Sequence, residues 1–237
     1  MARSAVPQTG LLASPVFSRA APFALFILFI ALQPLLAPYV DERWLCVARG
    51  LAIGALLLFF WRSYSELHPK SSRYISVGNV PATFRAVGLA IGVGIAVFAA
   101  WIQLDSGWVA FEMGRGFVPT RADGSLDMTL VALRLAGFAL VVPVMEELFW
   151  RSLVMRWIDS RDFLVVDPRR ASFVAFALSC ALFALEHSQW LAGLLAGAAY
   201  GWLYLRSGNL WIPIISHATT NGILALWIVA TGSWRFW

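Results

Sequence analysis

The chain has 237 residues, of which 60% are hydrophobic and only 13% are charged. About a quarter of the residues of an average soluble domain are charged, so this composition excludes an ordinary soluble globular protein. The 18 Lys and Arg residues exceed the 13 Asp and Glu residues, but they flank apolar segments instead of forming one basic patch, which argues against nucleic-acid binding. The sequence therefore indicates an integral membrane protein.

Long apolar segments follow one another along the whole chain. About 20 consecutive apolar residues suffice for a helix to cross a bilayer. We expect spans at residues 21–40, 45–61, 82–104, 128–157, 171–187, 190–206 and 209–231. Continuous apolar runs such as the one from Phe23 to Leu32 lack the alternation of a barrel strand. The sequence thus predicts an all-α fold, a polytopic transmembrane helical bundle of seven or eight spans, in a single integral membrane domain over residues 1–237.

The basic residues predict an orientation for these spans. If the N-terminus is cytoplasmic, most Lys and Arg residues fall in cytoplasmic segments, with a concentration between Arg151 and Arg170. Loops on the cytoplasmic side of membrane proteins carry an excess of positive charge. We therefore expect a cytoplasmic N-terminus and a C-terminus on the opposite side.

The span at 128–157 carries two adjacent carboxylates, Glu146 and Glu147. An ionisable group near the bilayer centre costs about 2.5–3.5 kcal/mol, so its presence indicates a function. Glu147 and Arg151 are spaced i, i+4 on one helix face and are expected to form an ion pair. Glu146 points about 100° away around the helix and is free to face another span. Pro143 can kink the helix and admit water.

Two later spans each bring a histidine to a similar depth. Counted at about 1.5 Å per residue from the inner end of each span, His187 and His217 reach the same layer as Glu146. Phe183 and His187 are spaced i, i+4, as are His217 and Asn221, so each pair lies on one helix face. The polar side chains of three spans are therefore expected to meet inside the membrane.

These residue types suit hydrolysis of an unreactive bond. Glu146 can act as a general base on a water molecule, which His187 can share unless it ligates a metal instead. His217 and the amide of Asn221 can donate hydrogen bonds to the oxyanion that develops. No serine or cysteine stands out as a nucleophile and the helical His-Glu-x-x-His signature is absent, so activated water is the expected reagent.

The span at 190–206 carries three glycines at four-residue spacing, Gly193, Gly197 and Gly201. Small residues at this spacing lie on one helix face and allow a neighbouring helix in the membrane to approach closely. We expect tight helix packing along this face and no chemistry from the glycines themselves.

Three motifs together resemble one known family. Residues Glu146–Arg151 resemble its EExxxR motif, Phe183–His187 its FxxxH motif and His217–Asn221 its HxxxN motif. The sequence is similar to the CPBP family of CAAX proteases and bacteriocin-processing enzymes, typified by the type II CAAX prenyl endopeptidase, and it looks somewhat like a related bacterial subgroup. The resemblance covers a motif-bearing core of about residues 128–225.

The resemblance implies an intramembrane endopeptidase with a hydrolytic site. Its catalytic residues would be Glu146, His187, His217 and Asn221. Its supporting residues would be Glu147, Arg151 and Phe183. The substrate would be a protein or peptide that is membrane-associated or lipid-linked and is cleaved near its C-terminus. The short loops fit a multi-pass protein of a bacterial inner membrane, which contacts the lipid bilayer and no nucleic acid.

Three alternatives remain open from the sequence. A catalytic Zn²⁺ ion could be held by Glu146, His187 and His217, and no other cofactor is indicated. A catalytically inactive family member could act as a membrane scaffold or immunity partner, although all the motif positions are intact. A transporter or proton relay would have polar residues strung across the membrane, whereas here they gather in one layer.

Overall fold

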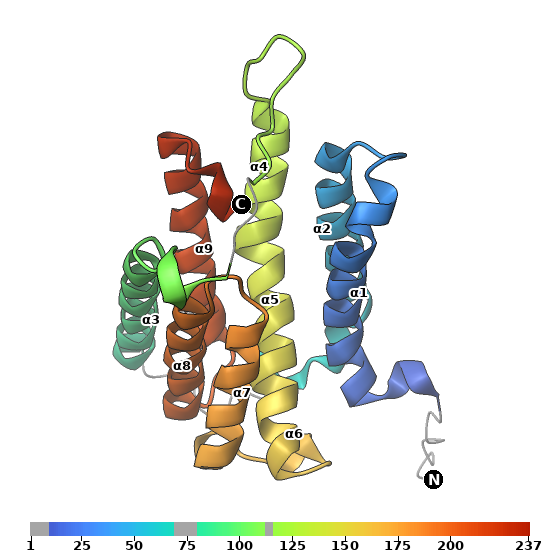
Figure 1. Ribbon diagram of the computed structural model, residues 1–237. Helices are drawn as coiled ribbons and strands as arrows, with labels where there is room; N and C mark the ends of the chain where they lie inside the picture. Colours follow the sequence, from blue (N-terminus) through green and yellow to red (C-terminus); the bar gives the residue numbers. More distant parts are fainter. Residues whose placement is uncertain (1–9, 69–79, 112–115) are drawn as a thin grey trace.

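The computed structural model describes residues 10–68, 80–111 and 116–237, and these residues are mostly helical (Figure 1). The α-helices are α1 (Pro15–Leu36), α2 (Glu42–Phe59), α3 (Val80–Trp101), α4 (Met128–Ala136), α5 (Val142–Glu147), α6 (Arg156–Asp159), α7 (Phe173–Leu185), α8 (Trp190–Ser207) and α9 (Trp211–Thr231). Within the described ranges the only β-type pairing is an isolated bridge between Thr120 and Leu126. The predicted all-α fold is confirmed.

Helices α4, α5 and α6 belong to one continuous helix, Met128–Asp159, which we call the long helix. Two π-helical stretches, Gly137–Val141 and Leu148–Met155, join its three α-helical parts. With the long helix counted once, a helix stands at each of the seven predicted positions. Helix α1 begins earlier than the predicted residue 21, because Ser14 caps its first turn by accepting a hydrogen bond from the Phe17 amide.

Among the described residues, four helices are long and apolar enough to cross a membrane: Pro15–Leu36, Thr83–Trp101, Met128–Asp159 and Trp211–Thr231. Helix α7 is also apolar but shorter. The chain is therefore a multi-pass bundle of membrane helices. The predicted number of seven or eight spans stays a prediction.

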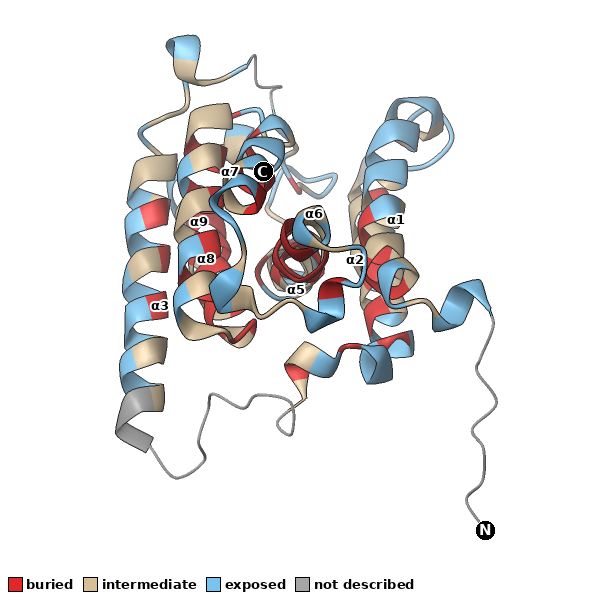
Figure 2. Cartoon of the chain, turned by 90° about the horizontal axis from the view of Figure 1, so that it is seen from below, coloured by how far each residue is buried: buried red, intermediate tan, exposed pale blue. Residues whose placement is uncertain are grey.

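The long helix passes through the middle of the bundle. Helices α1 and α2 pack on one side of it, and α7 and α9 pack on the other (Figure 1). On that second side α8 packs against α7 and α9, and α3 packs against α8 and α9. Seen along its axis, the lower part of the long helix is itself coloured as buried over most of its turns (Figure 2). Side chains that leave this helix in different directions can therefore reach both halves of the bundle.

The predicted close packing of the glycine-bearing helix is confirmed, and its partner is α7. A Cβ atom added at Gly193 would lie 3.2 Å from the Cα of Ala184 and 3.2 Å from the Cβ of His187. At Gly197 it would lie 3.3 Å from the Cα of Cys180. Because α8 carries no side chain at these points, it holds the end of α7 close to the long helix.

A buried ionic cluster ties α1 to the last turns of the long helix. Arg156 approaches Glu66 at 2.6 Å, and Arg19 of α1 forms a second ion pair with the same carboxylate. The hydroxyl of Ser152 also donates to Glu66. Burial raises the pKa of Glu66, but the two guanidinium groups outweigh this effect and lower the pKa to about 2. This cluster fixes one half of the bundle to the helix that carries Glu146 and Glu147.

Candidate active site

The two adjacent glutamates lie on α5, between the two π-helical stretches. Glu146 is 3% exposed and Glu147 is fully buried. Where the sequence predicted only a proline kink, the helix widens to π geometry before and after the segment that begins at Val142. Single π turns within α-helices are frequent at functional sites, because they redirect side chains and free carbonyl groups.

Glu147 is held from two sides. Its Oε2 atom lies 3.1 Å from Arg151 Nε, which confirms the predicted i, i+4 ion pair. Its Oε1 atom lies 2.9 Å from His217 Nδ1, a contact that the sequence did not predict. Because the Nδ1 side of the His217 ring is fixed in this way, its Nε2 atom faces Glu146, at 3.9 Å from Oε2.

Arg151 connects the long helix to both neighbouring helices. Its Nη2 atom donates to the carbonyl oxygen of Gly197 on α8 at 3.2 Å. Its guanidinium carbon lies 4.4 Å from the centre of the Phe183 ring on α7, within the range of a cation–π contact. The predicted supporting residues Arg151 and Phe183 therefore contact each other, and together they pack the three helices around Glu147.

Tyr200 is a site residue that sequence reasoning missed. Its ring stacks on the His217 ring at 4.8 Å with an interplanar angle of 18°. Its hydroxyl donates to Thr220 Oγ1 at 2.7 Å, one helical turn from His217. The available signal was a large polar residue on the glycine-bearing face of α8. Tyr200 and Glu147 together leave the His217 ring little freedom to rotate.

His187 lies just after α7, which ends at Leu185, two residues short of the predicted span end. Its Nδ1 atom is 2.8 Å from the carbonyl oxygen of Phe183, so the Nε2 atom is the one available to a reactant. Its ring contacts Phe183 at 4.7 Å and Trp101 at 5.3 Å between centroids. The aromatic contacts and the backbone bond orient the imidazole.

Asn221 reaches from α9 to the first π-helical stretch. Its Nδ2 atom donates to the carbonyl oxygen of Phe138 at 2.9 Å. A side-chain amide carries two N–H donors, so one remains for another acceptor. The contact uses a carbonyl group of the widened helix and holds the amide at the edge of the cavity described next.

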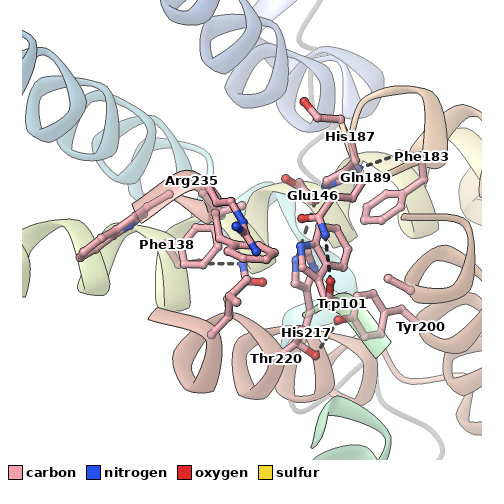
Figure 3. Close-up of a pocket in the computed structure, with 17 residues that line it drawn as sticks. Trp101, Phe138, Glu146, Phe183, His187, Gln189, Tyr200, His217, Thr220 and Arg235 are labelled. Carbon is pink, nitrogen blue, oxygen red and sulfur yellow. Dashed lines mark hydrogen bonds and ion pairs between the residues drawn. The ribbon is translucent and has the colours of Figure 1, made fainter. Parts of the chain in front are cut away.

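The four predicted catalytic residues line one cavity of about 230 Å³ (Figure 3). They are Glu146, His187, His217 and Asn221. Since one water occupies about 30 Å³, the cavity holds several waters or a short stretch of peptide. Glu146 Oε2 is buried without a hydrogen-bond partner among the described residues. A buried carboxylate oxygen of this kind calls for a water or a substrate group.

Residues from distant parts of the chain complete the cavity wall. The segment Arg235–Trp237 lines the cavity together with Phe138 (Figure 3). Arg235 also forms an ion pair with Asp105. Gln189 also borders it and donates to the carbonyl oxygen of Trp101 at 2.8 Å. These wall residues lie outside the three motifs, and their sequence spacing gives no sign of the contacts.

Within the described part of the chain, no group of three or more His, Cys, Asp and Glu side chains is arranged to hold a metal ion, and the zinc alternative stays a prediction. One nitrogen of His217 is bonded to Glu147 and one nitrogen of His187 to the backbone. Metal-ligating histidines make such bonds too, and the Nε2 atom of each ring is left for another partner. The chemistry below is described with the side chains and water alone.

Comparison with known proteins agrees with this geometry. Residues 128–223 match the family described as type II CAAX prenyl endopeptidase Rce1-like. This segment belongs to the Rce1-like family. The Rce1-like segment contains all three motifs and coincides closely with the core of residues 128–225 that carried the resemblance, so the predicted family is confirmed.

A relative of known sequence points the same way. "Putative membrane peptidase YdiL" of Bacillus subtilis (strain 168) is 26% identical over 150 residues, which are 60% of this chain and 57% of the relative. The matched part is thus less than two thirds of that protein's length. No solved structure matches the chain. The Rce1-like segment and this relative both indicate a membrane protease in general terms.

Proposed function

We propose that the protein is an intramembrane endopeptidase that hydrolyses a peptide bond near the C-terminus of a membrane-associated or lipid-linked protein. The observation that carries this proposal is the buried Oε2 atom of Glu146, which has no hydrogen-bond partner among the described residues and lies in a cavity shared with His187, His217 and Asn221. A carboxylate so placed, with hydrogen-bonding groups around it and space for water, is suited to general-base catalysis.

The first step is the activation of water. Glu146 accepts a proton from a water molecule in the cavity while His187 Nε2 helps to orient that water. The resulting hydroxide attacks the carbonyl carbon of the substrate, and the carbonyl oxygen becomes an oxyanion. Holding water and substrate at contact distance in an enclosed site removes much of the entropic cost of this step.

The second step is the stabilisation and collapse of the tetrahedral intermediate. The free N–H of Asn221 donates to the oxyanion, and so does His217 Nε2–H when the ring carries both protons. Glu147 then balances the charge of the His217 ring, because it lies 2.9 Å from Nδ1. When the C–N bond breaks, Glu146 returns its proton to the leaving amine, and the carboxylate is ready for another cycle.

We further propose that the protein lies in a bacterial inner membrane with its N-terminus in the cytoplasm. The support is the concentration of arginines in and around the segment that joins α6 to α7, from Arg151 to Arg170. The partners of the enzyme would then be its peptide or protein substrate and the lipid of that membrane.

The decisive experiment compares membrane-protein C-termini in the native host by mass spectrometry. The strains are the wild type, a deletion, and the deletion complemented with Glu146→Gln or with the control Asp123→Asn in an exposed turn. We expect one or more proteins to lose a processed form in the deletion and in Glu146→Gln, but not in the control. If Glu146→Gln restores every processed form, the hydrolytic proposal is wrong and a scaffold or immunity role replaces it.

A further inference from the structure

A second cavity, of about 580 Å³, lies between helices α1 and α2 and the long helix. Most of its wall is apolar, and it ends on Glu146 and His187, two of the residues that also line the first cavity. Its other charged wall residues are Glu186, beside His187, and two arginines, Arg49 of α2 and Arg134 of α4. The cavity thus joins the catalytic carboxylate to a pair of cations through apolar walls.

The guanidinium groups of this arginine pair contact rings instead of carboxylates. Arg134 lies 4.8 Å from the Trp237 ring centre and 5.3 Å from that of Phe117. Arg49 lies 5.0 Å from the Phe26 ring centre, and its one hydrogen bond is a weak contact of 3.8 Å to a cysteine sulfur. Over the residues that the structure describes, neither arginine has an ion pair or an oxygen acceptor.

The buried arginines of the protein have partners of a different kind from those of this half-buried pair. Arg19 and Arg156 share Glu66, and Arg151 is paired with Glu147. Two cations that face one apolar cavity without a counter-ion repel each other and lose hydration. A planar guanidinium offers five N–H donors in a geometry that matches a carboxylate or phosphate. The arginine pair is therefore equipped for an anionic ligand.

The spacing between the arginine pair and the catalytic residues suits a short peptide. Arg134 precedes Glu146 by 12 residues along one helix, which corresponds to about 18 Å. An extended peptide covers about 3.3–3.6 Å per residue, so about five residues bridge this distance, and fewer if the arginine side chains bend toward the site.

We propose that Arg49 and Arg134 bind the C-terminal carboxylate of the substrate while its scissile bond lies at Glu146. This inference rests on the proposed endopeptidase function and adds the group that would set the position of the cut, about five residues or fewer before the C-terminus. An anionic lipid headgroup offers similar chemistry. Because the wall of one cavity includes the arginine pair, Glu146 and His187, we favour a substrate that reaches all of them over a lipid headgroup.

The test measures binding without turnover. The protein carries Glu146→Gln and is placed in nanodiscs of phosphatidylcholine. The probes are an N-terminally fluorescent octapeptide of alternating alanine and leucine with a free C-terminal carboxylate, and the same peptide as its C-terminal amide. Binding of both is compared with that to the same protein bearing Arg49→Gln and Arg134→Gln. The matched control is Arg43→Gln, since Arg43 lies on the same helix as Arg49 but is ion-paired with Asp41.

We expect the free acid to bind at least about tenfold more tightly than the amide, and this preference to vanish in the double arginine variant but not in Arg43→Gln. Replacing both arginines by lysine should retain part of the preference, which separates loss of charge from misfolding. Equal binding of acid and amide to the intact arginine pair overturns the proposal.

A further experiment with an anionic lipid tests whether a headgroup, instead of the substrate, occupies the arginine pair. In one outcome, phosphatidylglycerol raises the melting temperature of the protein only when the arginine pair is intact, and the two peptides bind equally. This outcome would assign the arginine pair to a lipid headgroup and overturn the substrate site. A different outcome would contradict the proposed protease function and leave the arginine site standing. A protein that prefers the free acid but leaves every processed form in the host unchanged on deletion would keep the arginine site and lose the protease activity.

Discussion

At the scale of single residues, the site depends on two neighbouring carboxylates with opposite surroundings. Glu147 forms an ion pair with Arg151 and a hydrogen bond with His217. Among the residues described, Glu146 Oε2 has no hydrogen-bond partner and lies 3.9 Å from His217 Nε2. The difference follows from helix geometry, since consecutive residues point about 100° apart. Glu147 therefore holds the neighbouring helices together, while Glu146 faces the cavity and is available for the proposed reaction.

The motif residues of the site could be predicted from the sequence, because an ionisable group inside a membrane helix is energetically costly and therefore marks a functional site. The i, i+4 spacing likewise predicted the pairing of Glu147 with Arg151. Tyr200 and the wall segment Arg235–Trp237 were not accessible, because their contacts join helices that are far apart in sequence. The catalytic roles themselves stay predictions until they are tested.

For Asn221→Ala, we expect kcat to fall by about 10²–10³ with little change in KM, because an oxyanion donor acts only in the transition state. The measurement is steady-state cleavage of a substrate identified by the host comparison. Thr219→Ala on the same helix serves as the control, since Thr219 bonds only to the carbonyl oxygen of Ile215. A rise in KM at unchanged kcat would instead assign Asn221 to substrate binding.

The ionic cluster around Glu66 predicts a dependence of stability on pH. Its pKa in the folded protein, about 2, is below the ordinary value of 4.5, so its contribution to stability is complete above about pH 4.5. The contribution is lost as the pH falls through that window toward 2, and it is on the order of 3 kcal/mol. Unfolding in detergent from pH 6 to pH 2 should show this loss for the wild type. Glu66→Gln should be less stable at pH 6 and should lack this part of the pH dependence; an equal slope for both would contradict the prediction.

At the scale of elements, the long helix and the glycine-bearing α8 set the positions of the candidate catalytic residues. The lengths of the apolar segments predicted the helices well, because a bilayer-spanning helix must be long and apolar. The π-helical stretches were not predicted, since π geometry is set by packing and by contacts such as that of Asn221 with Phe138. The start of α1 was misplaced because the cap at Ser14 lies outside the apolar run.

Gly193→Ala should disturb the site more than the fold. Its new methyl group would meet His187 and Ala184 at 3.2 Å, so His187 must shift or α8 must move away from α7. We expect a loss of about 1–3 kcal/mol in the free energy of unfolding and a fall in cleavage rate of about tenfold or more.

The matched control is Gly92→Ala on α3, where an added methyl group meets nothing within 4 Å. It should be neutral or stabilising by about 0.5–1 kcal/mol, because glycine is a poor helix former. Thermal unfolding and cleavage assays compare the two variants. Equal effects on cleavage would show that the contact with His187 is unimportant.

At the scale of the whole molecule, the long helix divides the bundle into α1 and α2 on one side and α3, α7, α8 and α9 on the other (Figure 2). The first cavity opens between the long helix and the larger group, and the second between the long helix and the smaller one. Apolar segments give the number of helices, but they do not give their neighbours, because lipid-facing and helix-facing apolar residues look alike in a sequence.

The orientation of the molecule is tested by labelling single cysteines. After Cys46 and Cys180 are replaced by alanine, one cysteine is introduced at Ser106 or at Val165, which is 72% exposed. We expect a membrane-impermeant maleimide to label position 106 in intact spheroplasts, and position 165 only after permeabilisation. The reverse pattern would place the N-terminus outside the cytoplasm.

The second π-helical stretch, Leu148–Met155, makes the number of residues in the long helix as important as their identity. Removing Val154 would leave every motif residue in place. If the winding of the helix did not otherwise change, the deletion would turn everything beyond it by about 100° and move it by about 1.5 Å. Arg156 would then lose its alignment with Glu66, while Glu146 and Glu147 stayed where they are. Homologous chains should therefore resist insertion and deletion here even at positions where they tolerate substitution.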